Sequence, residues 1–343
     1  MSRKPVAIVG AKGYAARELI NILLRHPKVQ LTALGDKLDK PESLTSVFPE
    51  FYERSDLMIE DARVEEICKK AEVIFLALPH KVAQDYAAPF CQAGKIVIDL
   101  SADFRFENLE VYEKTYAIIH QARDLNATAV YGLPEIYRDR IRAARLIGNP
   151  GCYPTSIILA CLPLIRTDWY DPNSIIADSK SGVSGAGRIP TTVTHYISCN
   201  ESIRAYSLAG HRHTPEVEEK LSLAAGRDIP VQFTPHLTPM DRGILSTIYI
   251  NITGDISEKD IRKLYEEAYR DEPFVRFLPE GLLPQTKTVS GTNYCDIGMK
   301  LDTRTRRLII VSAIDNLIKG ASGQAVQNMN IVLGFDERDG LVV

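Results

Sequence analysis

The feature that most constrains the fold is an apolar run that passes through a glycine turn into a helical pattern near the start of the chain. Val6–Val9 reads as a short buried strand, Gly10–Gly13 as a turn, and Tyr14–Arg25 as an amphipathic helix. This order directs free backbone N–H groups and the positive end of the helix dipole toward an anion. Gly10 permits the tight turn, and Gly13 permits close approach of a ligand to the backbone. The pattern predicts a site for the pyrophosphate of a dinucleotide, and the alternative is a purely structural turn.

The rest of the N-terminal half alternates short β-branched runs with amphipathic segments, which is typical of a parallel sheet with crossover helices. The further strands that we predict are Val29–Leu34, Val73–Ala77, Ile96–Asp99 and Leu146–Gly148, with a helix at Val82–Cys91. This half therefore predicts an α/β domain, a Rossmann-type doubly wound sheet, over residues 1–150.

The second half changes to glycine-rich loops followed by longer strand-like runs, which favours an antiparallel α+β domain. The strands predicted here are Val231–Phe233, Ile244–Ile252 and Leu308–Ile314, and the helices are Pro154–Leu164, Pro215–Ala225 and Ser257–Tyr269. We expect residues 151–314 to form a catalytic and dimerisation domain. We expect a C-terminal helix, 315–343, to complete the first domain.

Composition excludes several classes of protein. The 41 Lys and Arg against 44 Asp and Glu give a net charge of -3, so we expect no nucleic-acid partner. The most apolar stretch, Ile157–Ile165, is too short to cross a bilayer and contains Pro163, and no secretory signal is visible. Six cysteines are scattered without C-x-x-C pairs, which predicts reduced thiols, a cytoplasmic location and no metal site.

One cysteine stands in a context that favours reactivity. Cys152 lies between a predicted strand and the apolar helix that follows, where the helix dipole and free N–H groups favour the thiolate. The same N–H groups could hold the oxyanion of a tetrahedral adduct on the sulfur. The alternative is a small buried side chain, as we assign to the other five: Cys68, Cys91, Cys161, Cys199 and Cys295.

A partner base is offered by Gly210–Glu216, which contains His211, Arg212 and His213 directly before a predicted helix. An imidazole can transfer protons near neutral pH, and a guanidinium can form a fork to a carboxylate or phosphate. The rival interpretations are a helix-capping turn or a metal site, and the metal site lacks third and fourth ligands at sensible spacing. We treat the remaining histidines as structural or surface residues: His26, His80, His120, His195 and His236.

Two more glycine-rich segments, Ser181–Arg188 and Asp315–Gln324, each follow a strand-like run. Glycine at such places lets a ligand approach the backbone closely. The alternative is a pair of ordinary connecting loops.

Taken together, these segments resemble the N-acetyl-gamma-glutamyl-phosphate reductases, the arginine-biosynthesis branch of the semialdehyde dehydrogenase superfamily. The resemblance spans essentially the whole chain. Its landmarks are Gly10–Tyr14, Leu100–Arg105, Tyr131–Glu135, Asn149–Thr155, Ser181–Arg188, Gly210–Glu216, Phe233–Leu237 and Asp315–Asn330.

The resemblance implies a role for individual residues. The family's nucleophile falls on Cys152 and its acid/base histidine on His211. The cofactor residues implied are Gly10, Lys12, Gly13, Tyr14, Asp36, Lys37, Ser181, Gly182, Gly185 and Asn316. By resemblance and charge, the residues placed near the substrate are Arg105, Asn149, Arg188, Arg204, Arg212 and His213.

The implied activity is NADPH-dependent reduction of an acyl phosphate, N-acetylglutamyl 5-phosphate, to the semialdehyde through a Cys152 thioester. The implied assembly is a homo-oligomer, either a dimer or a tetramer. Two alternatives stay open: a sister activity on aspartyl phosphate or on a carrier-linked acyl phosphate, and a dinucleotide-sensing protein without turnover.

The choice of cofactor is contested by the residues after the second predicted strand. Asp36 stands where a carboxylate usually accepts hydrogen bonds from the ribose of NAD and repels a 2′-phosphate. Lys37 is adjacent to it and Lys12 lies in the glycine turn, so two ammonium groups could bind that phosphate. We therefore expect NADP to be preferred, although less strongly than in the family, and NAD to be used less well.

Overall fold

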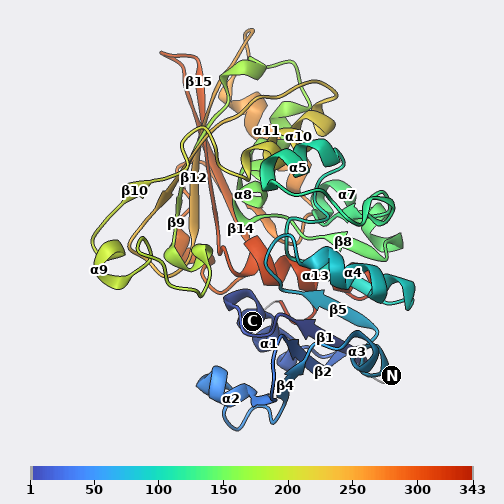
Figure 1. The fold of residues 1–343 in the computed structure, drawn as a ribbon. Helices are drawn as coiled ribbons and strands as arrows, with labels where there is room; N and C mark the ends of the chain where they lie inside the picture. Colours follow the sequence, from blue (N-terminus) through green and yellow to red (C-terminus); the bar gives the residue numbers. More distant parts are fainter. Residues whose placement is uncertain (1–2, 342–343) are drawn as a thin grey trace. The chain divides into compact units, whose positions relative to one another are not determined.

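The computed structural model describes residues 3–341, which form two compact units (Figure 1). One unit contains the chain up to Gly151 and again from Ala321 onward, and the other is Cys152–Gly320. Residues 315–320 thus belong to the second unit, not with the C-terminal helix as the sequence suggested. The boundary falls immediately before Cys152 because strand β8 (Leu146–Gly148) ends the first sheet there.

The first unit is built on an eight-stranded sheet in the order β3-β4-β2-β1-β5-β6-β8-β7. Every pair of neighbours is parallel except β3 with β4. Besides β8, its strands are β1 (Lys4–Val9), β2 (Val29–Asp36), β3 (Glu42–Ser43), β4 (Met58–Asp61), β5 (Val73–Leu76), β6 (Ile96–Asp99) and β7 (Val130–Tyr131). All four residues of β5 are buried, as expected for a strand covered on both faces. This confirms the Rossmann-type sheet.

Helices pack with this sheet in the first unit, and most of them connect its strands. They are α1 (Tyr14–Arg25), α2 (Leu44–Val47), α3 (Val64–Lys70), α4 (Ala83–Gln92), α5 (Leu109–Tyr116), α6 (Arg123–Asn126), α7 (Pro134–Ala143) and α13 (Gly323–Val332), with a 3-10 turn η1 (Pro49–Phe51). The predicted range of α1 coincides with the observed one. Helix α13 is shorter than the predicted 315–343, and a π-helical turn, η4 (Ile318–Ser322), precedes it.

The second unit is built on a seven-stranded sheet in the order β10-β11-β9-β12-β15-β14-β13. Its strands are β9 (Ile176–Ser181), β10 (Arg204–Ala205), β11 (Gln232–Leu237), β12 (Ile244–Asn251), β13 (Val275–Phe277), β14 (Cys295–Asp302) and β15 (Arg307–Ile314). The expectation of an antiparallel domain is corrected in part, because β11 is parallel to β9 and β13 is parallel to β14. Both parallel pairs join strands that are separated by helices, a connection that local sequence does not reveal.

The helices of the second unit are α8 (Cys152–Ile165), α9 (Tyr196–Cys199), α10 (Thr214–Ala225), α11 (Glu258–Tyr269) and α12 (Thr286–Val289), with 3-10 turns η2 (Pro172–Ser174) and η3 (Val183–Ala186). Helix α8 is buried along almost its whole length, between β12 and β15 on one side and α10 and α11 on the other. These three helices lie on one side of the strands in Figure 1. The nucleophile candidate is therefore fixed to the best-packed helix of its unit.

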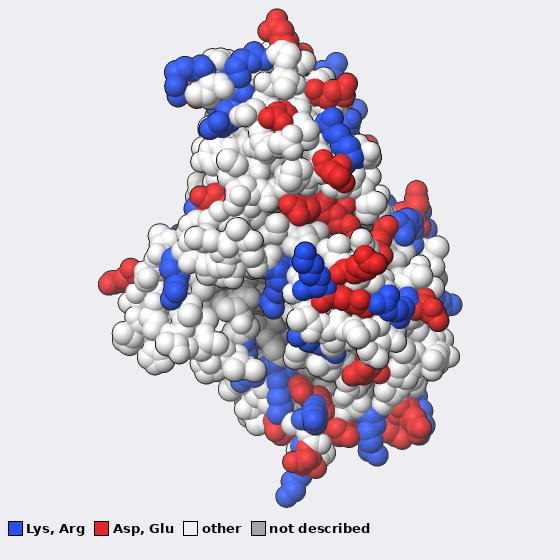
Figure 2. All heavy atoms as spheres, turned by 45° about the horizontal axis from the view of Figure 1, so that its top comes forward, with Lys and Arg blue, Asp and Glu red and all other residues white. Residues whose placement is uncertain are grey.

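None of the helices formed by residues 3–341 has both the length and the apolar character that a bilayer span requires. On the face shown in Figure 2, basic and acidic side chains are intermixed, and no extended area of one sign is visible there.

Helix α13 is anchored to the rest of the first unit through a buried histidine. His26, which follows α1, is 1% exposed, and its Nδ1 accepts the backbone N–H of Lys28 at 3.2 Å. The ring proton therefore lies on Nε2, which donates to Asn330 Oδ1 at 3.0 Å. Asn330 Nδ2 in turn donates to the carbonyl oxygens of Glu337 and Asp339. Burial lowers the pKa of His26 below its ordinary 6.5, so the ring is neutral at pH 7.

Replacing Asn330 by Ala should lower the free energy of unfolding by about 2 kcal/mol, because it leaves a buried imidazole N–H and two carbonyls without their partner. Urea unfolding at pH 7.5 measures this change. The matched control is Asn173→Ala at an exposed turn, which should change stability by less than about 0.5 kcal/mol. Because the folded-state pKa of His26 is depressed, the stability from its neutral ring is full above pH 6.5 and is lost as the pH falls through the folded-state value. An Asn330→Ala variant as stable as the control would show that the anchor contributes nothing.

Candidate active site

The candidate nucleophile is the first residue of a helix. Cys152 opens α8 and is half-buried. A Cβ atom at Gly320 would lie 2.8 Å from the Cβ of Cys152, so only glycine allows the two segments to approach so closely. The sulfur is thus carried by backbone at the positive end of a helix, where the helix dipole favours a thiolate.

The two predicted histidines lie together in the second unit. His211 and His213 are 8% and 7% exposed, and their ring centroids are 4.9 Å apart. The backbone N–H of His213 donates to His211 Nδ1 at 3.1 Å, which leaves the proton of the neutral ring on Nε2. Burial, together with the positive charge of Arg212, lowers the pKa of His211 to about 4. His211 is therefore a neutral imidazole at physiological pH.

Aromatic side chains that the sequence did not single out surround His211. The rings of Tyr153, Tyr206 and Phe233 lie 5.6, 5.5 and 5.2 Å from its ring. The Tyr206 hydroxyl donates to the Tyr153 hydroxyl at 3.1 Å. Burial raises the pKa of Tyr206 to about 12 and raises that of Tyr153 further, and the charge of the nearby Cys152 also disfavours ionisation of both. Cysteine, histidine and two protonated phenols thus share one site.

The glycine turn of the first unit has the shape of an anion site. Gly10 has φ +88°, and a Cβ there would lie 2.4 Å from the Ala77 carbonyl oxygen, so no other residue fits. Gly13 is the N-cap of α1, no side chain caps that helix end, and no other atom lies within 4 Å of a Cβ built there. Tyr14 begins the helix. The N–H groups of the first turn are therefore accessible to a phosphate, which fits a dinucleotide.

Asp36 at the end of β2 is bound to this turn. Its Oδ2 accepts the backbone N–H of Lys12 at 3.1 Å, and its Oδ1 accepts that of Lys37 at 2.8 Å. The Lys12 ammonium pairs with Glu42 at 2.9 Å. Asp36 therefore shapes the glycine turn in addition to any contact with a ribose.

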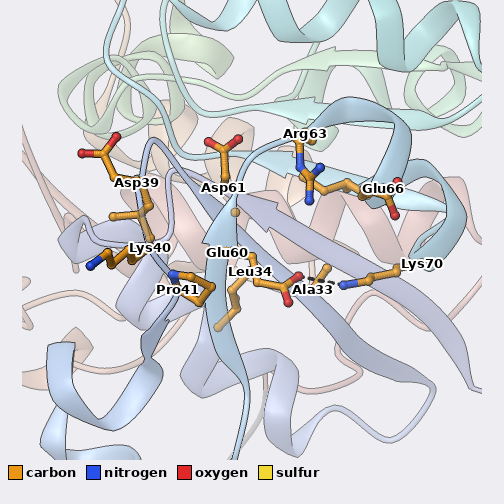
Figure 3. Close-up of a pocket in the computed structure, with 13 residues that line it drawn as sticks. Ala33, Leu34, Asp39, Lys40, Pro41, Glu60, Asp61, Arg63, Glu66 and Lys70 are labelled. Atoms are coloured by element: carbon orange, nitrogen blue, oxygen red, sulfur yellow. Dashed lines mark hydrogen bonds and ion pairs between the residues drawn. The ribbon is translucent and has the colours of Figure 1, made fainter.

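A cavity of about 520 Å³ opens beside these residues at the carboxyl ends of β2 and β4. Figure 3 shows it between the Leu34–Pro41 segment and α3, with Arg63, Glu66 and Lys70 on the α3 side. Its position next to the glycine turn suits the adenosine end of a dinucleotide, because such ligands bind outside the carboxyl ends of parallel strands.

The two other glycine-rich segments lie together in the second unit. Asn316 Nδ2 donates to Ser184 Oγ at 3.1 Å, and its Oδ1 accepts the Gly243 N–H at 2.7 Å. A Cβ on Gly182 would lie 2.6 Å from the Asp241 carbonyl oxygen, whereas Gly185 lies close to the side chains of Ser181 and Asn316.

Arg242 and Asp315 support this arrangement. The sequence did not indicate Arg242, and it marked Asp315 only as the start of a glycine-rich segment, without a role. The buried Asp315 carboxylate pairs with Arg242 at 3.3 Å and accepts the Gly291 N–H at 2.7 Å. In the sequence, the only indication of a role for Asp315 was its position directly before Asn316, a candidate cofactor residue.

The predicted substrate residues divide into two sets. Arg105 is buried, and its Nε and Nη2 donate to the carbonyl oxygens of Asn149 and Leu100 at 2.7 and 2.8 Å. Asn149 is fully buried, and its side chain donates to the Ala321 carbonyl and accepts from Asn328. In contrast, the exposed set lies in one stretch of the second unit and consists of Arg188, Arg204 and Arg212.

Comparison with known proteins identifies the family. The family model described as the semialdehyde dehydrogenase NAD-binding domain matches residues 5–144. The family model described as the semialdehyde dehydrogenase dimerisation domain matches residues 152–316. The chain belongs to the semialdehyde dehydrogenase family. Within this family, curated relatives named N-acetyl-gamma-glutamyl-phosphate reductase are 51% identical over 336 residues in Pelotomaculum thermopropionicum and 52% identical over 337 residues in Geobacter metallireducens. Both alignments cover 98% of this chain and 97% of the relative.

Solved structures of other semialdehyde dehydrogenases share the fold. Aspartate semialdehyde dehydrogenase II of Vibrio cholerae, complexed with ASA, aligns with a TM-score of 0.70 at 17% identity over 97% of this chain and 99% of that chain. The aspartate semialdehyde dehydrogenase of Candida albicans with NADP aligns at 0.68 and 15% identity, also over 97% and 99%. The two-domain semialdehyde dehydrogenase fold is thereby confirmed.

Proposed function

We propose that this chain catalyses the NADPH-dependent reduction of N-acetylglutamyl 5-phosphate to N-acetylglutamate 5-semialdehyde and phosphate, a step of arginine biosynthesis, through a thioester on Cys152. The observation that carries the proposal is the cysteine at the start of α8 in the same unit as a neutral, buried His211. The names of the curated relatives, at about half of all positions identical over nearly the full chain, support this substrate.

The first step is acyl transfer. The Cys152 sulfur attacks the carbonyl carbon of the acyl phosphate as the thiolate, its thiol proton having passed to solvent. The bond from that carbon to the phosphate oxygen then breaks, so phosphate departs and takes up a proton from solvent, and a thioester remains. The Nε2–H of His211 and backbone N–H groups at the start of α8 are the donors proposed for the oxyanion.

The second step reduces the thioester. The hydride for the carbonyl carbon would be supplied by NADPH when it is bound. The alkoxide that results on Cys152 is protonated with the help of His211, and the carbon–sulfur bond then breaks to release the aldehyde and the thiol. Tyr153 and Tyr206 stay protonated because their pKa values are raised, so they add no negative charge of their own near Cys152.

Different residues bind and position the substrate in this proposal. Arg188, Arg204 and Arg212 are exposed cations that suit its carboxylate and phosphate, and His213 lies against His211. Arg105 and Asn149 position the backbone just before Cys152 in addition to any substrate contact, because they hydrogen-bond backbone and side-chain groups of their own unit.

For the cofactor we propose NADP, with NAD used less well. The residues that would hold it are Gly10, Lys12, Gly13, Tyr14, Asp36 and Lys37 in the first unit, and Ser181, Gly182, Gly185 and Asn316 in the second. The uncapped start of α1 and the cavity beside β2 fit a dinucleotide.

The preference for NADPH over NADH should shift in opposite directions in two variants. Lys12→Ser removes a cation near the proposed 2′-phosphate and should lower the ratio of kcat/KM values about fivefold, whereas Asp36→Ser removes a carboxylate and should raise it. Steady-state kinetics with both cofactors measures the ratios. A wild-type enzyme that prefers NADH would contradict the proposal.

We also propose that the chain forms a homo-oligomer, a dimer or a tetramer, in the cytoplasm. Along β12, buried side chains alternate with half-buried ones such as Leu245, Thr247 and Tyr249, which lie on the sheet face opposite α8. The matching family model is described as a dimerisation domain. All six cysteines are free thiols, which suits a reducing compartment.

One assay tests substrate, cofactor and reaction type together. N-acetylglutamate 5-semialdehyde with inorganic phosphate and NADP should yield NADPH, and omission of phosphate should stop the reaction. Parallel assays with aspartate semialdehyde and with a carrier-linked semialdehyde test the sister activities. Equal or faster turnover of either would overturn the assignment of the substrate.

A further inference from the structure

The glycine turn of the first unit holds an ion pair that the established family chemistry does not require. Lys12 Nζ lies 3.0 Å from Oε1 and 2.9 Å from Oε2 of Glu42, so the ammonium is bridged by both carboxylate oxygens. The two side chains are 33% and 41% exposed, which leaves the pair accessible to a ligand and only partly screened by water.

Both partners are held by backbone. Lys12 is fixed because its N–H donates to Asp36 at 3.1 Å within the turn that follows β1. Glu42 begins the short strand β3 and is paired there with Ile59 of β4. The ion pair therefore joins the phosphate-binding turn to the edge of the sheet, and backbone contacts hold both of its residues in place.

One other cation of the neighbouring cavity is already matched by a carboxylate. The charged residues that line it are Asp39, Lys40, Glu60, Asp61, Arg63, Glu66 and Lys70. Lys70 pairs with Glu60 at 2.7 Å, as the dashed line in Figure 3 shows. A 2′-phosphate, which carries close to two negative charges, must compete with the Glu42 carboxylate if it is to bind the Lys12 ammonium.

We propose that Glu42 is a cofactor-selectivity residue: its carboxylate competes with the 2′-phosphate of NADPH for Lys12 and thereby weakens the preference for NADPH over NADH. The inference rests on the proposed binding of a nicotinamide dinucleotide at this turn. NADH has no group that needs Lys12 in this way, so its affinity should depend little on Glu42.

The test measures binding to the full-length protein, so that it does not depend on turnover. Dissociation constants for NADPH and NADH come from the change in nicotinamide fluorescence, and those for adenosine 2′,5′-bisphosphate and 5′-AMP, which differ only by the 2′-phosphate, come from calorimetry. Glu42→Gln should raise the preference for the 2′-phosphorylated ligand about fivefold in both pairs. The change should lie in the affinity for NADPH and for the bisphosphate. The gain should shrink as salt is added.

Two further variants make the assignment specific. In a Lys12→Gln background, Glu42→Gln should have no further effect, because the group for which it competes is gone. Glu60→Gln removes the same charge from the neighbouring cavity and also breaks an ion pair, yet should change the preference by less than about twofold. An unchanged preference in Glu42→Gln, an equal rise in Glu60→Gln, or a rise that persists without Lys12 would each overturn the role of Glu42. Failure of the semialdehyde assay, with the binding pattern intact, would instead refute the proposed reaction alone.

Discussion

Cys152→Ala should abolish turnover, with kcat lowered at least about a thousandfold, because the variant has no sulfur on which to form the thioester. Folding should be preserved, since Cys152 is half-buried at a helix start and the smaller side chain creates no large cavity. Affinity for NADPH should also be unchanged within about twofold. The measurements are steady-state kinetics with N-acetylglutamate semialdehyde, a thermal unfolding scan and NADPH titration.

The matched control is Cys91→Ala. Burial raises the pKa of the Cys91 thiol to about 11, so this cysteine stays protonated and unreactive at pH 7. Iodoacetamide should modify one cysteine per chain in the wild type and in Cys91→Ala, and no cysteine rapidly in Cys152→Ala. Bound substrate should protect Cys152 from this modification. Retention of more than about a tenth of wild-type activity by Cys152→Ala would rule out the thioester mechanism.

Substitution of the two histidines should separate proton transfer from binding. His211→Asn should lower kcat about a hundredfold, because it removes the Nε2–H donor and the only imidazole placed to relay the proton in this proposal. His213→Asn should mainly raise KM, since its backbone N–H, which holds His211 Nδ1, stays in place.

Steady-state kinetics between pH 6 and pH 9 measures both effects. Because the pKa of His211 in the fold is about 4, its ring stays neutral over this range, and the wild-type kcat should show no titration that His211→Asn removes. If His213→Asn instead lowers kcat and His211→Asn raises KM, the two roles are exchanged.

Much of the first unit could be predicted because its signals are local. The turn at Gly10 and the amphipathic pattern of Tyr14–Arg25 depend on neighbouring residues only, and both appear where expected. The same holds for β6 and β8, whose predicted bounds agree with the structure. Cys152 at a helix start follows from an apolar run that directly succeeds a strand.

Other features depend on which distant segments meet. The sequence by itself indicated the Rossmann-type half, the family landmarks and the candidate pair Cys152 and His211. Only the tertiary structure decided that β9 and β11 are parallel, that Tyr206 contacts Tyr153, and that Glu42 pairs with Lys12. These contacts join residues far apart along the chain, and their existence depends on strand register and packing, which no periodicity in one segment encodes.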